Sequence, residues 1–330
     1  MIFMPPDISV IILTYNEELH IRRCIENARR VAKDIFVIDC FSTDRTVEIA
    51  KEYDNVQVIS HEWPGNQADQ LNWALEHPRE VPIRTEWVLR LDADEYLTDE
   101  LIAEIQERLP TLRTDQTGVI FSRRVIFMER WIRRGVPTVH LLRLFRYRRA
   151  ICEKRLMDEH MQLLEGETVD FHGAFYDHNL NDIGWWTAKH NGYAIREAAD
   201  LLDAELGIFE SARTGATPSE RSREKMPEKK VSEKSSGRSA PRISAQAAAK
   251  RAKKLKYAGM PLFWRAFAYF VLRYVVRLGF LEGAPGFMWH FLQGWWYRTL
   301  VDARVWQIKK TCGNDRAKIV GYLKERGIRM

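Results

Sequence analysis

The residues most suited to chemistry are two aspartates two positions apart, Asp92 and Asp94, with only Ala93 between them. At the end of a strand, side chains at positions i and i+2 point to the same side, so both carboxylates can face one ligand. Two hard oxygen donors of this kind suit magnesium or manganese that also binds substrate phosphates. Such a metal would stabilise negative charge on a departing diphosphate. The alternative is an acidic turn that caps the helix expected from Thr98.

Other polar residues occur where they would reach the same edge of a sheet. Thr14, Asn16 and Glu17 directly follow one apolar run, and Asp39 ends the next one. In open α/β sheets, ligands bind in the crevice outside the carboxyl ends of the strands. We therefore expect these four residues to bind the same ligand as Asp92.

The elements that must position these residues alternate between strand-like and helix-like patterns. The first apolar run is nearly continuous and rich in β-branched residues, which is typical of a strand buried on both faces. The alternation predicts an α/β fold with a doubly wound, mostly parallel sheet and helices on both faces. The expected strands are 8–13, 34–39, 56–59, 86–91, 118–127 and 141–147, and the expected helices are 18–31, 46–53, 67–76 and 182–202.

Three segments resemble, in the right order, the motifs of the family 2 glycosyltransferases, which have the GT-A fold. They are residues 8–17, 37–44 and 87–95, and the resemblance extends over roughly residues 8–180. It implies a Rossmann-like sheet and an inverting enzyme that moves a sugar from a nucleotide-sugar, expected to be a UDP-sugar, to a glycan or lipid-linked acceptor. It also implies a divalent metal, magnesium or manganese, bound at the third segment.

The resemblance places a catalytic carboxylate at the start of a helix after the metal motif. That carboxylate takes the proton from the acceptor hydroxyl as it attacks the anomeric carbon. The matching stretch is 156–160, where Glu159 is the expected base and Asp158 the alternative. Either side chain could instead cap a helix or pair with Arg155, and the sequence does not separate these roles.

The remaining donor contacts also follow from the resemblance. Arg143 and Arg146 precede the expected base at a distance suited to a diphosphate, although in a strand only one of them would face it. Asn72 matches a helical residue before the metal motif, but Leu71 stands where the family often has a basic residue. His178 would complete the metal coordination or form a hydrogen bond within a loop.

The helix after His178 carries Lys189, His190 and Tyr193. These three residues could contact phosphate or the acceptor, but a helix face exposed to solvent is the more common role for such residues. We therefore expect them to face solvent.

Residues 260–281 are strongly apolar yet are interrupted by Arg265, Arg273 and Arg277, which fall on one helix face. No charge-free run is long enough to cross a bilayer. We expect a helix that lies along a membrane surface or packs on the catalytic domain, then a break at 283–286 and an aromatic helix. These amphipathic helices resemble those of the subgroup that adds sugars to lipopolysaccharide core or lipid-linked glycans, which implies a role in cell-envelope synthesis.

The composition predicts three parts: a catalytic domain at 1–210, a basic disordered linker at 211–257 and a helical segment at 258–330. From Ser211 to Lys256 there are 14 Lys and Arg against 4 Glu, so the net charge of +6 comes from this segment. The linker lacks interleaved aromatic residues, which argues against nucleic-acid binding. Scattered cysteines and no signal-peptide pattern predict a cytoplasmic protein, peripheral on the inner face of the membrane.

Two other functions are compatible with an α/β sheet of this kind. A nucleotidyltransferase would need a Gly-rich, basic loop after the first strand, and the loop that begins at Thr14 is not of this type. A catalytically degenerate, membrane-associated scaffold would keep the fold without binding nucleotide. The intact acidic triplet and Asp39 argue against the scaffold.

Overall fold

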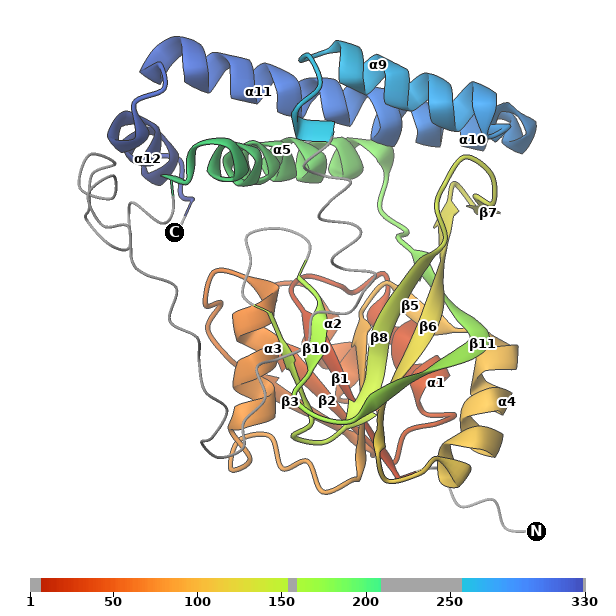
Figure 1. Cartoon of the computed structure of the whole chain (residues 1–330). Helices are drawn as coiled ribbons and strands as arrows, with labels where there is room; N and C mark the ends of the chain where they lie inside the picture. The colour runs from red at the N-terminus through yellow and green to blue at the C-terminus, as the bar shows by residue number, and fades with distance from the viewer. Residues whose placement is uncertain (1–6, 154–158, 209–256, 329–330) are drawn as a thin grey trace, which may run out of the picture.

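The structure, a computed structural model, describes residues 7–153, 159–208 and 257–328. A curled sheet forms the lower part of the molecule, and a layer of helices lies across its top (Figure 1). The expected linker at 211–257 lies, apart from its last residue, outside the described residues.

The first half of the chain alternates strands and helices as expected. The bounds are β1 (Ile8–Thr14), α1 (Ile21–Ala28), β2 (Asp34–Asp39), α2 (Thr46–Ala50), β3 (Val56–Ser60), α3 (Gln67–Glu76) and β4 (Trp87–Asp92). β1 pairs in parallel with both β2 and β4, and β2 pairs in parallel with β3. The carboxyl ends of these four strands therefore meet at one edge of the sheet.

The sheet continues with strands that run in both directions. They and the neighbouring elements are β5 (Glu95–Leu97), α4 (Asp99–Arg108), η1 (Leu109–Thr111), β6 (Gln116–Phe127), β7 (Arg130–Trp131), β8 (Val139–Arg146), β9 (Ala150–Cys152), β10 (Met161–Leu163) and β11 (Glu167–His178). In the described residues the strand order is β3-β2-β1-β4-β8-β6-β11-β5, with β7 paired to β6 and a separate β9–β10 pair. β8 is antiparallel to its neighbours β4 and β6.

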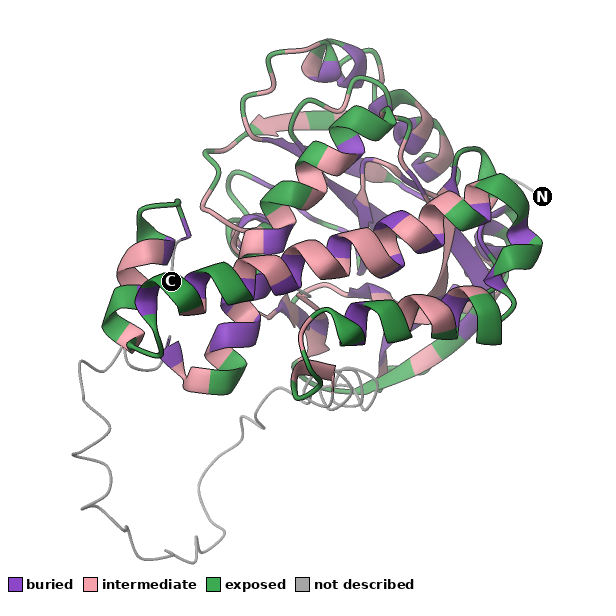
Figure 2. Cartoon of the chain, turned by 90° about the horizontal axis from the view of Figure 1, so that it is seen from above, coloured by how far each residue is buried: buried purple, intermediate pink, exposed green. Residues whose placement is uncertain are grey.

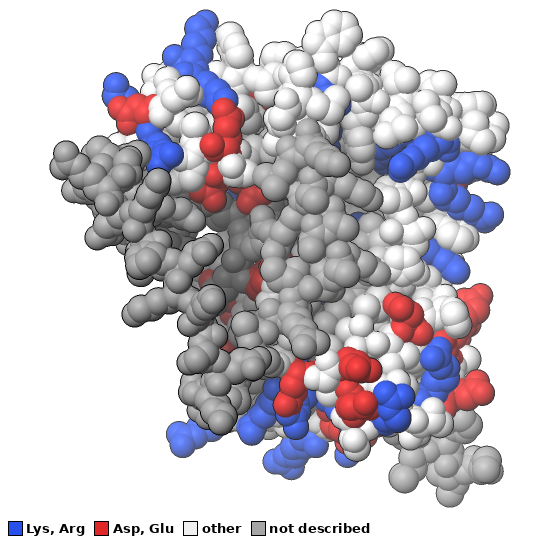
Figure 3. Space-filling model, in the orientation of Figure 1, with Lys and Arg blue, Asp and Glu red and all other residues white. Residues whose placement is uncertain are grey.

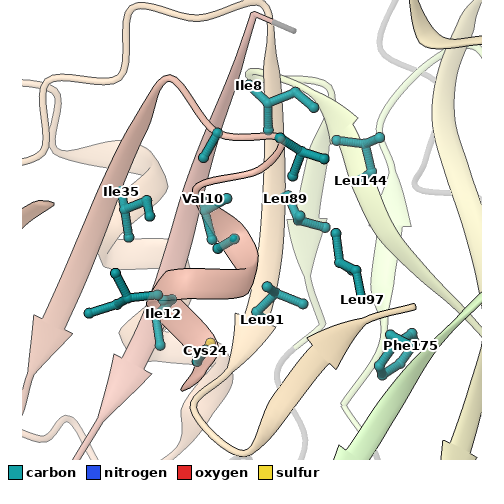
Figure 4. Packing of buried hydrophobic residues seen from close by; sticks show 14 of the residues in the cluster. Ile8, Val10, Ile12, Cys24, Ile35, Leu89, Leu91, Leu97, Leu144 and Phe175 are labelled. Atoms are coloured by element: carbon teal, nitrogen blue, oxygen red, sulfur yellow. The ribbon is translucent and has the colours of Figure 1, made fainter. Parts of the chain in front are cut away.

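Both faces of the sheet are buried, and β1 shows why. Ile8, Val10 and Ile12 belong to a core that includes residues of α1, α2 and α4. The close view shows them with Cys24 of α1 and with Leu89 and Leu91 of β4 (Figure 4). Ile11 points the other way, into a second core with α3. Successive side chains of a strand alternate between faces, so a continuous apolar run serves both cores. The predicted α/β class with helices on both faces is confirmed.

The acidic triplet occupies the turn between β4 and β5. β5, which begins at Glu95, then pairs antiparallel with the end of β11, and Glu95 lies opposite Asp177. The His178 amide donates a hydrogen bond to the Asp94 carbonyl oxygen, with 3.0 Å between nitrogen and oxygen. This pairing brings residues 177 and 178, which are distant in sequence, against the triplet.

The helical layer follows the last strand. It comprises α5 (Ile183–Leu206), α9 (Trp264–Val271), a π-helical turn η2 (Leu272–Val276), a 3₁₀ turn η3 (Gly279–Glu282), α10 (Gly283–Trp289), a π-helical stretch η4 (His290–Trp296), α11 (Tyr297–Cys312) and α12 (Arg316–Lys324). Apolar residues of α5, α11 and α12 form a core of their own. None of the helices in the described residues combines the length and apolar character that crossing a bilayer requires.

The predicted helix break at 283–286 is wrong, because α10 begins there. Pro285 lies in the first turn of α10, where a missing amide hydrogen breaks no helical hydrogen bond. The break comes earlier, at Leu278, whose φ of 58° is left-handed. It is followed by Gly279, where a Cβ atom would lie only 2.5 Å from the His290 ring.

Two of the three arginines of the predicted amphipathic helix, Arg265 and Arg273, are buried, whereas Arg277 is exposed. Arg265 is 3% exposed, and its Nε donates a 2.7 Å hydrogen bond to Asp302 of α11, which is fully buried. The same carboxylate accepts a 2.7 Å hydrogen bond from the Phe263 amide. This buried ion pair joins the start of α9 to α11.

The substitution Asp302→Ala is therefore expected to lower the free energy of unfolding by about 3–5 kcal/mol, because it leaves the buried Arg265 charge without a partner. Urea unfolding of the two proteins measures the difference. The matched control is the more exposed pair between Lys309 of the same helix and Glu205 of α5, where Glu205→Ala should change stability by about 1 kcal/mol or less. Equal losses in the two variants would contradict a special role for Asp302.

Candidate active site

A cleft of about 1290 Å³ lies between the carboxyl edge of the sheet and the helical layer. Five carboxylates form one side of it, which we call the acidic floor: Glu17, Asp92, Asp94, Glu95 and Asp177. Residues of α5, η2, η4 and α11 line the opposite side. Typical sites for one small ligand measure roughly 300–1,000 Å³, so this cleft has room for two.

Asp92 is held in its charged form by two arginines. Arg90 and Arg143 each approach its carboxylate to 3.4 Å. Burial by itself would raise the pKa of Asp92, but the two guanidinium groups outweigh it and lower the pKa to about 2. A permanently charged carboxylate at this position suits binding of a cation or of ligand hydroxyls.

The other floor carboxylates repel one another. Burial raises the pKa of Glu95 to about 8, with Asp92 and Asp177 adding to the rise and Arg143, its ion-pair partner, opposing it. Burial also raises the pKa of Asp177, and after the opposing effect of Arg123 the charges of Asp94 and Asp92 add to it. A cation bound among these groups would relieve the repulsion.

Asp94 and His178 lie next to each other in the backbone, but only Asp94 lines the cleft. The Asp94 carboxylate accepts a 3.0 Å hydrogen bond from the Asn179 amide. Arg23 lies 3.1 Å from His178 Nδ1, and Glu129 lies 3.1 Å from Nε2. Because arginine can only donate, Nδ1 must accept and Nε2 must carry the proton. A metal would reach His178 only by replacing Glu129, whose side chain is 78% exposed.

The loops after β1 and β2 are joined into one platform. Asp39 is 1% exposed, and its carboxylate accepts hydrogen bonds from the Thr14 hydroxyl, at 3.0 Å, and from the Ser42 amide, at 2.8 Å. Asn16 has a left-handed φ of 55° and accepts a 2.8 Å hydrogen bond from the Thr43 amide. Glu17 extends from this platform into the cleft. Thr14 pairs with Asp39 and Leu13 with Asp92, so platform and triplet are adjacent.

The structure brings only one of the two predicted arginines to the triplet. Arg143 is 5% exposed and contacts both Asp92 and Glu95. Arg146 pairs with Trp87, the first residue of β4, and therefore lies at the opposite end of that strand from Asp92. Its guanidinium pairs with Glu86 and packs 4.6 Å over the Trp87 ring.

Asn72 and Glu159 lie close to β9. Both ends of the Asn72 amide bind the Cys152 backbone, at 2.8 Å each, so this side chain holds β9 against α3. Burial raises the pKa of the Cys152 thiol to about 11, and the charge of Glu159 adds to the rise after the opposing effect of Arg90. Arg90 also contacts Asp92, which connects the Glu159 region to the triplet. Asp158 lies outside the described residues.

Several residues of the cleft were not predicted or were predicted differently. Asp177 and Arg23 gave no recognisable signal, because each reaches the triplet only through the pairing of β5 with β11 and the packing of α1. Lys189, His190 and Tyr193 were expected to face solvent, yet they are half-buried and line the cleft. The polar side of α5 is thus turned toward the site.

Comparison with known proteins gives similar sequences and folds. An uncharacterized glycosyltransferase of Rickettsia typhi is 29% identical over 206 residues, which are 59% of this chain and 68% of that protein. The lipopolysaccharide core biosynthesis glycosyltransferase LpsC of Rhizobium meliloti is 30% identical over 121 residues, 36% of this chain and 42% of that protein. The solved mannosyltransferase PcManGT of Pyrobaculum calidifontis, in complex with GDP-Man and Mn²⁺, is 14% identical with a TM-score of 0.46, over 92% of this chain and 88% of that one.

The family match covers the region that builds the floor and the platform. Residues 9–182 match the family described as glycosyl transferase family 2. This region spans more than half of the chain and includes the acidic triplet, the two joined loops and the strand that carries Asp177. The chain therefore belongs to glycosyl transferase family 2, and it is a glycosyltransferase with the GT-A fold.

Proposed function

We propose that this enzyme is an inverting glycosyltransferase that transfers a sugar from a nucleotide-sugar, in the first instance a UDP-sugar, with the help of a divalent metal. The observation that carries the proposal is the crowding of Asp92, Asp94 and Asp177 at the cleft, beside the Asp39 platform. Repelling carboxylates next to a polar platform suit a cation with a nucleoside diphosphate.

The donor set fits a metal that shares its ligands with the substrate. Among the described residues, no three His, Cys, Asp or Glu side chains converge on one point. Magnesium and manganese are commonly held by one or two carboxylates together with substrate phosphates. Asp94 would supply the protein ligand, Asp92 would lie beside it, and His178 would join only after Glu129 moves away. When bound, the metal would neutralise the negative charge that develops on the departing diphosphate.

The chain's own residues would divide the remaining work. The platform of Thr14, Asn16 and Asp39, with Glu17 at its edge, would hold the nucleoside. Arg143 keeps Asp92 charged and oriented, so it acts on the donor through that carboxylate. Glu159, or Asp158, would take the proton from the acceptor hydroxyl. Asn72 would position the segment that carries the base, through its bonds to Cys152.

The acceptor is proposed to be a glycan or lipid-linked glycan of the cell envelope, as the name of the relative LpsC suggests. The outer face of α9, η2 and η3 supports contact with a lipid surface, because its large side chains are apolar and exposed: Trp264, Phe267, Val275, Val276, Leu278, Phe280 and Leu281. Seen from above, α9 carries exposed positions along its length (Figure 2). In the space-filling view the top right of the molecule is mostly uncharged, with Lys and Arg below it (Figure 3).

Charge complementarity favours an anionic lipid surface, at the inner face of the membrane. Arg277 is exposed between Val276 and Leu278, and Arg133 is exposed at the hairpin that meets this layer. An apolar face flanked by cations is the pattern of peripheral helices that bind anionic lipids.

The variant Asp94→Ala is expected to lose metal-dependent binding and hydrolysis of the nucleotide-sugar, with turnover reduced roughly 100- to 1,000-fold. Thermal shift with a panel of nucleotide-sugars and Mn²⁺ identifies the donor, and release of the nucleoside diphosphate measures turnover. Excess EDTA should have the same effect on the wild-type protein. Asp54→Ala, at a carboxylate whose side chain is 88% exposed, is the control. Full activity of Asp94→Ala would rule out this metal site.

The variant Glu159→Gln is expected to reduce sugar transfer roughly 100- to 10,000-fold, because the amide cannot accept the proton. Donor affinity in the presence of Mn²⁺ should stay unchanged, since the donor binds elsewhere. Asp158→Asn, tested alongside, separates the two candidates. If both variants transfer sugar at the wild-type rate, neither residue is the base.

Replacement of Trp264 or Val276 by serine is expected to weaken binding to vesicles of phosphatidylglycerol and phosphatidylethanolamine roughly tenfold, the effect of losing about 1.5 kcal/mol of apolar burial. Co-sedimentation measures the bound fraction. Trp306→Ser is the matched control, since Trp306 is 50% exposed but lies on α11, away from this face. Equal binding by all variants would exclude this surface as the lipid contact.

A further inference from the structure

The side of the cleft opposite the acidic floor carries cations. Lys189 of α5, Arg273 of η2 and Arg298 of α11 all line the cleft, and we call these three residues the cationic roof. They come from three elements that are far apart in the sequence. Their convergence is therefore a product of the fold, and the motifs of the family-matched region up to residue 182 do not include them.

Arg273 is buried, and no acidic side chain among the described residues pairs with it. It is 3% exposed, and its Nε donates a 3.0 Å hydrogen bond to the Gly135 carbonyl oxygen of the β7–β8 connection. Burial lowers the pKa of Arg273, the Tyr269 phenol opposes this, and the cations Arg298 and Arg277 lower it further. The positive charges of Arg298 and Arg277 thus repel the charge of Arg273 inside the cleft.

Arg273 and Arg298 share one aromatic ring. Each guanidinium carbon lies 5.3 Å from the centre of the Tyr269 ring, and that of Arg298 also lies 5.4 Å from the Tyr257 ring. The nearest acidic oxygen to Arg298 belongs to Glu197, at 4.0 Å. Among the described residues Arg298 Nε has no hydrogen-bond partner. The stacking fixes the two guanidinium planes and leaves hydrogen-bond donors unused.

The same helical layer contains an arginine whose charge is neutralised by an acidic partner. Arg265, one element before Arg273, is paired with Asp302 through two nitrogens. Burying a cation without such a partner is costly. Among the described residues Arg273 has no acidic partner, and Arg298 has only the 4.0 Å contact with Glu197, so a ligand that brings negative charge would complete the site. Guanidinium groups bind phosphate and carboxylate through two parallel hydrogen bonds.

Lys189 connects the roof with the floor. Its ammonium lies 4.4 Å from the centre of the Trp185 ring. Burial lowers the pKa of Lys189, but Tyr193, Asp94 and Glu17 outweigh it and raise the pKa. The charge of Lys189 is thus balanced by the floor, whereas Arg273, and Arg298 beyond its 4.0 Å contact with Glu197, can pair with a second ligand.

We propose that the cationic roof binds an anionic group, phosphate or carboxylate, of the acceptor, so that the acceptor is a negatively charged glycan. The inference rests on the proposed function, because it assigns the floor to the donor diphosphate. The volume of the cleft accommodates both substrates at once. An acceptor anchored at the roof would present its hydroxyl toward the floor, where the sugar leaves the diphosphate.

Calorimetric titration of the full chain with inorganic phosphate tests the proposal, first in EDTA and then with saturating UDP and Mg²⁺, or with the nucleoside diphosphate found in the donor screen. Phosphate should bind in both conditions. Arg298→Gln should weaken phosphate binding roughly tenfold or more, because a charged hydrogen-bond donor is lost. The affinity for the nucleoside diphosphate should change less than twofold, on the order of experimental error.

Three matched variants make the result specific. Arg298→Lys keeps the charge and should retain most of the phosphate affinity. Arg304→Gln, on the same helix but paired with Asn191 outside the cleft, should bind phosphate like the wild type. Arg273→Gln tests the roof from η2, in case Arg298→Gln does not fold.

Three outcomes overturn the proposal. Displacement of phosphate by the nucleoside diphosphate would assign the roof to the donor, and an equal loss in Arg304→Gln, or no binding at all, would remove the site. If no nucleoside diphosphate binds with metal while phosphate binding still depends on Arg298, the proposed function fails and the anion site stands.

Discussion

The electrostatic balance at the turn between β4 and β5 is the constraint on which the site depends. Four carboxylates meet there, and the buried Arg143 from β8 contacts two of them, Asp92 and Glu95. Arg143 helps to lower the pKa of Asp92 to about 2 and opposes the burial that raises the pKa of Glu95 to about 8. With Arg143 in place, the balance still leaves Asp94 and Asp177 repelling each other. A further cation at the carboxyl edge of the sheet would reduce this repulsion.

The helical layer shows the opposite polarity. Arg265 and Arg273 point inward, toward Asp302 and the cleft, while Trp264, Val275 and Val276 are exposed on the outer face. In a water-soluble helix the apolar face is normally buried and the cations normally face solvent. Under the proposed function, an inward cation suits an anionic substrate and an outward apolar face suits a lipid surface. The layer would then orient the cleft with respect to a membrane that carries the acceptor.

Much of the fold follows from local patterns. The predicted bounds of β2 and α3 agree with the structure, because a β-branched run and an amphipathic stripe act over a few residues. The apolar face of α1 is buried in full. The break at 283–286 was misplaced because Gly and Pro signals do not tell a helix start from a helix end unless the position of Pro285 in the first turn is known.

The sequence by itself determined the class of the fold, the family and the acidic triplet, because these depend on motifs of consecutive residues at strand ends. Only the tertiary structure decided which partners the triplet has. The pairing of β5 with β11 adds Asp177, and the direction of β8 brings Arg143 to the site and carries Arg146 to the other end of the strand. The roof is likewise invisible in the sequence, since Arg273 and Arg298 meet over Tyr269 only when separate helices pack. Strand register and helix packing join residues that are far apart along the chain, and no local pattern records those distances.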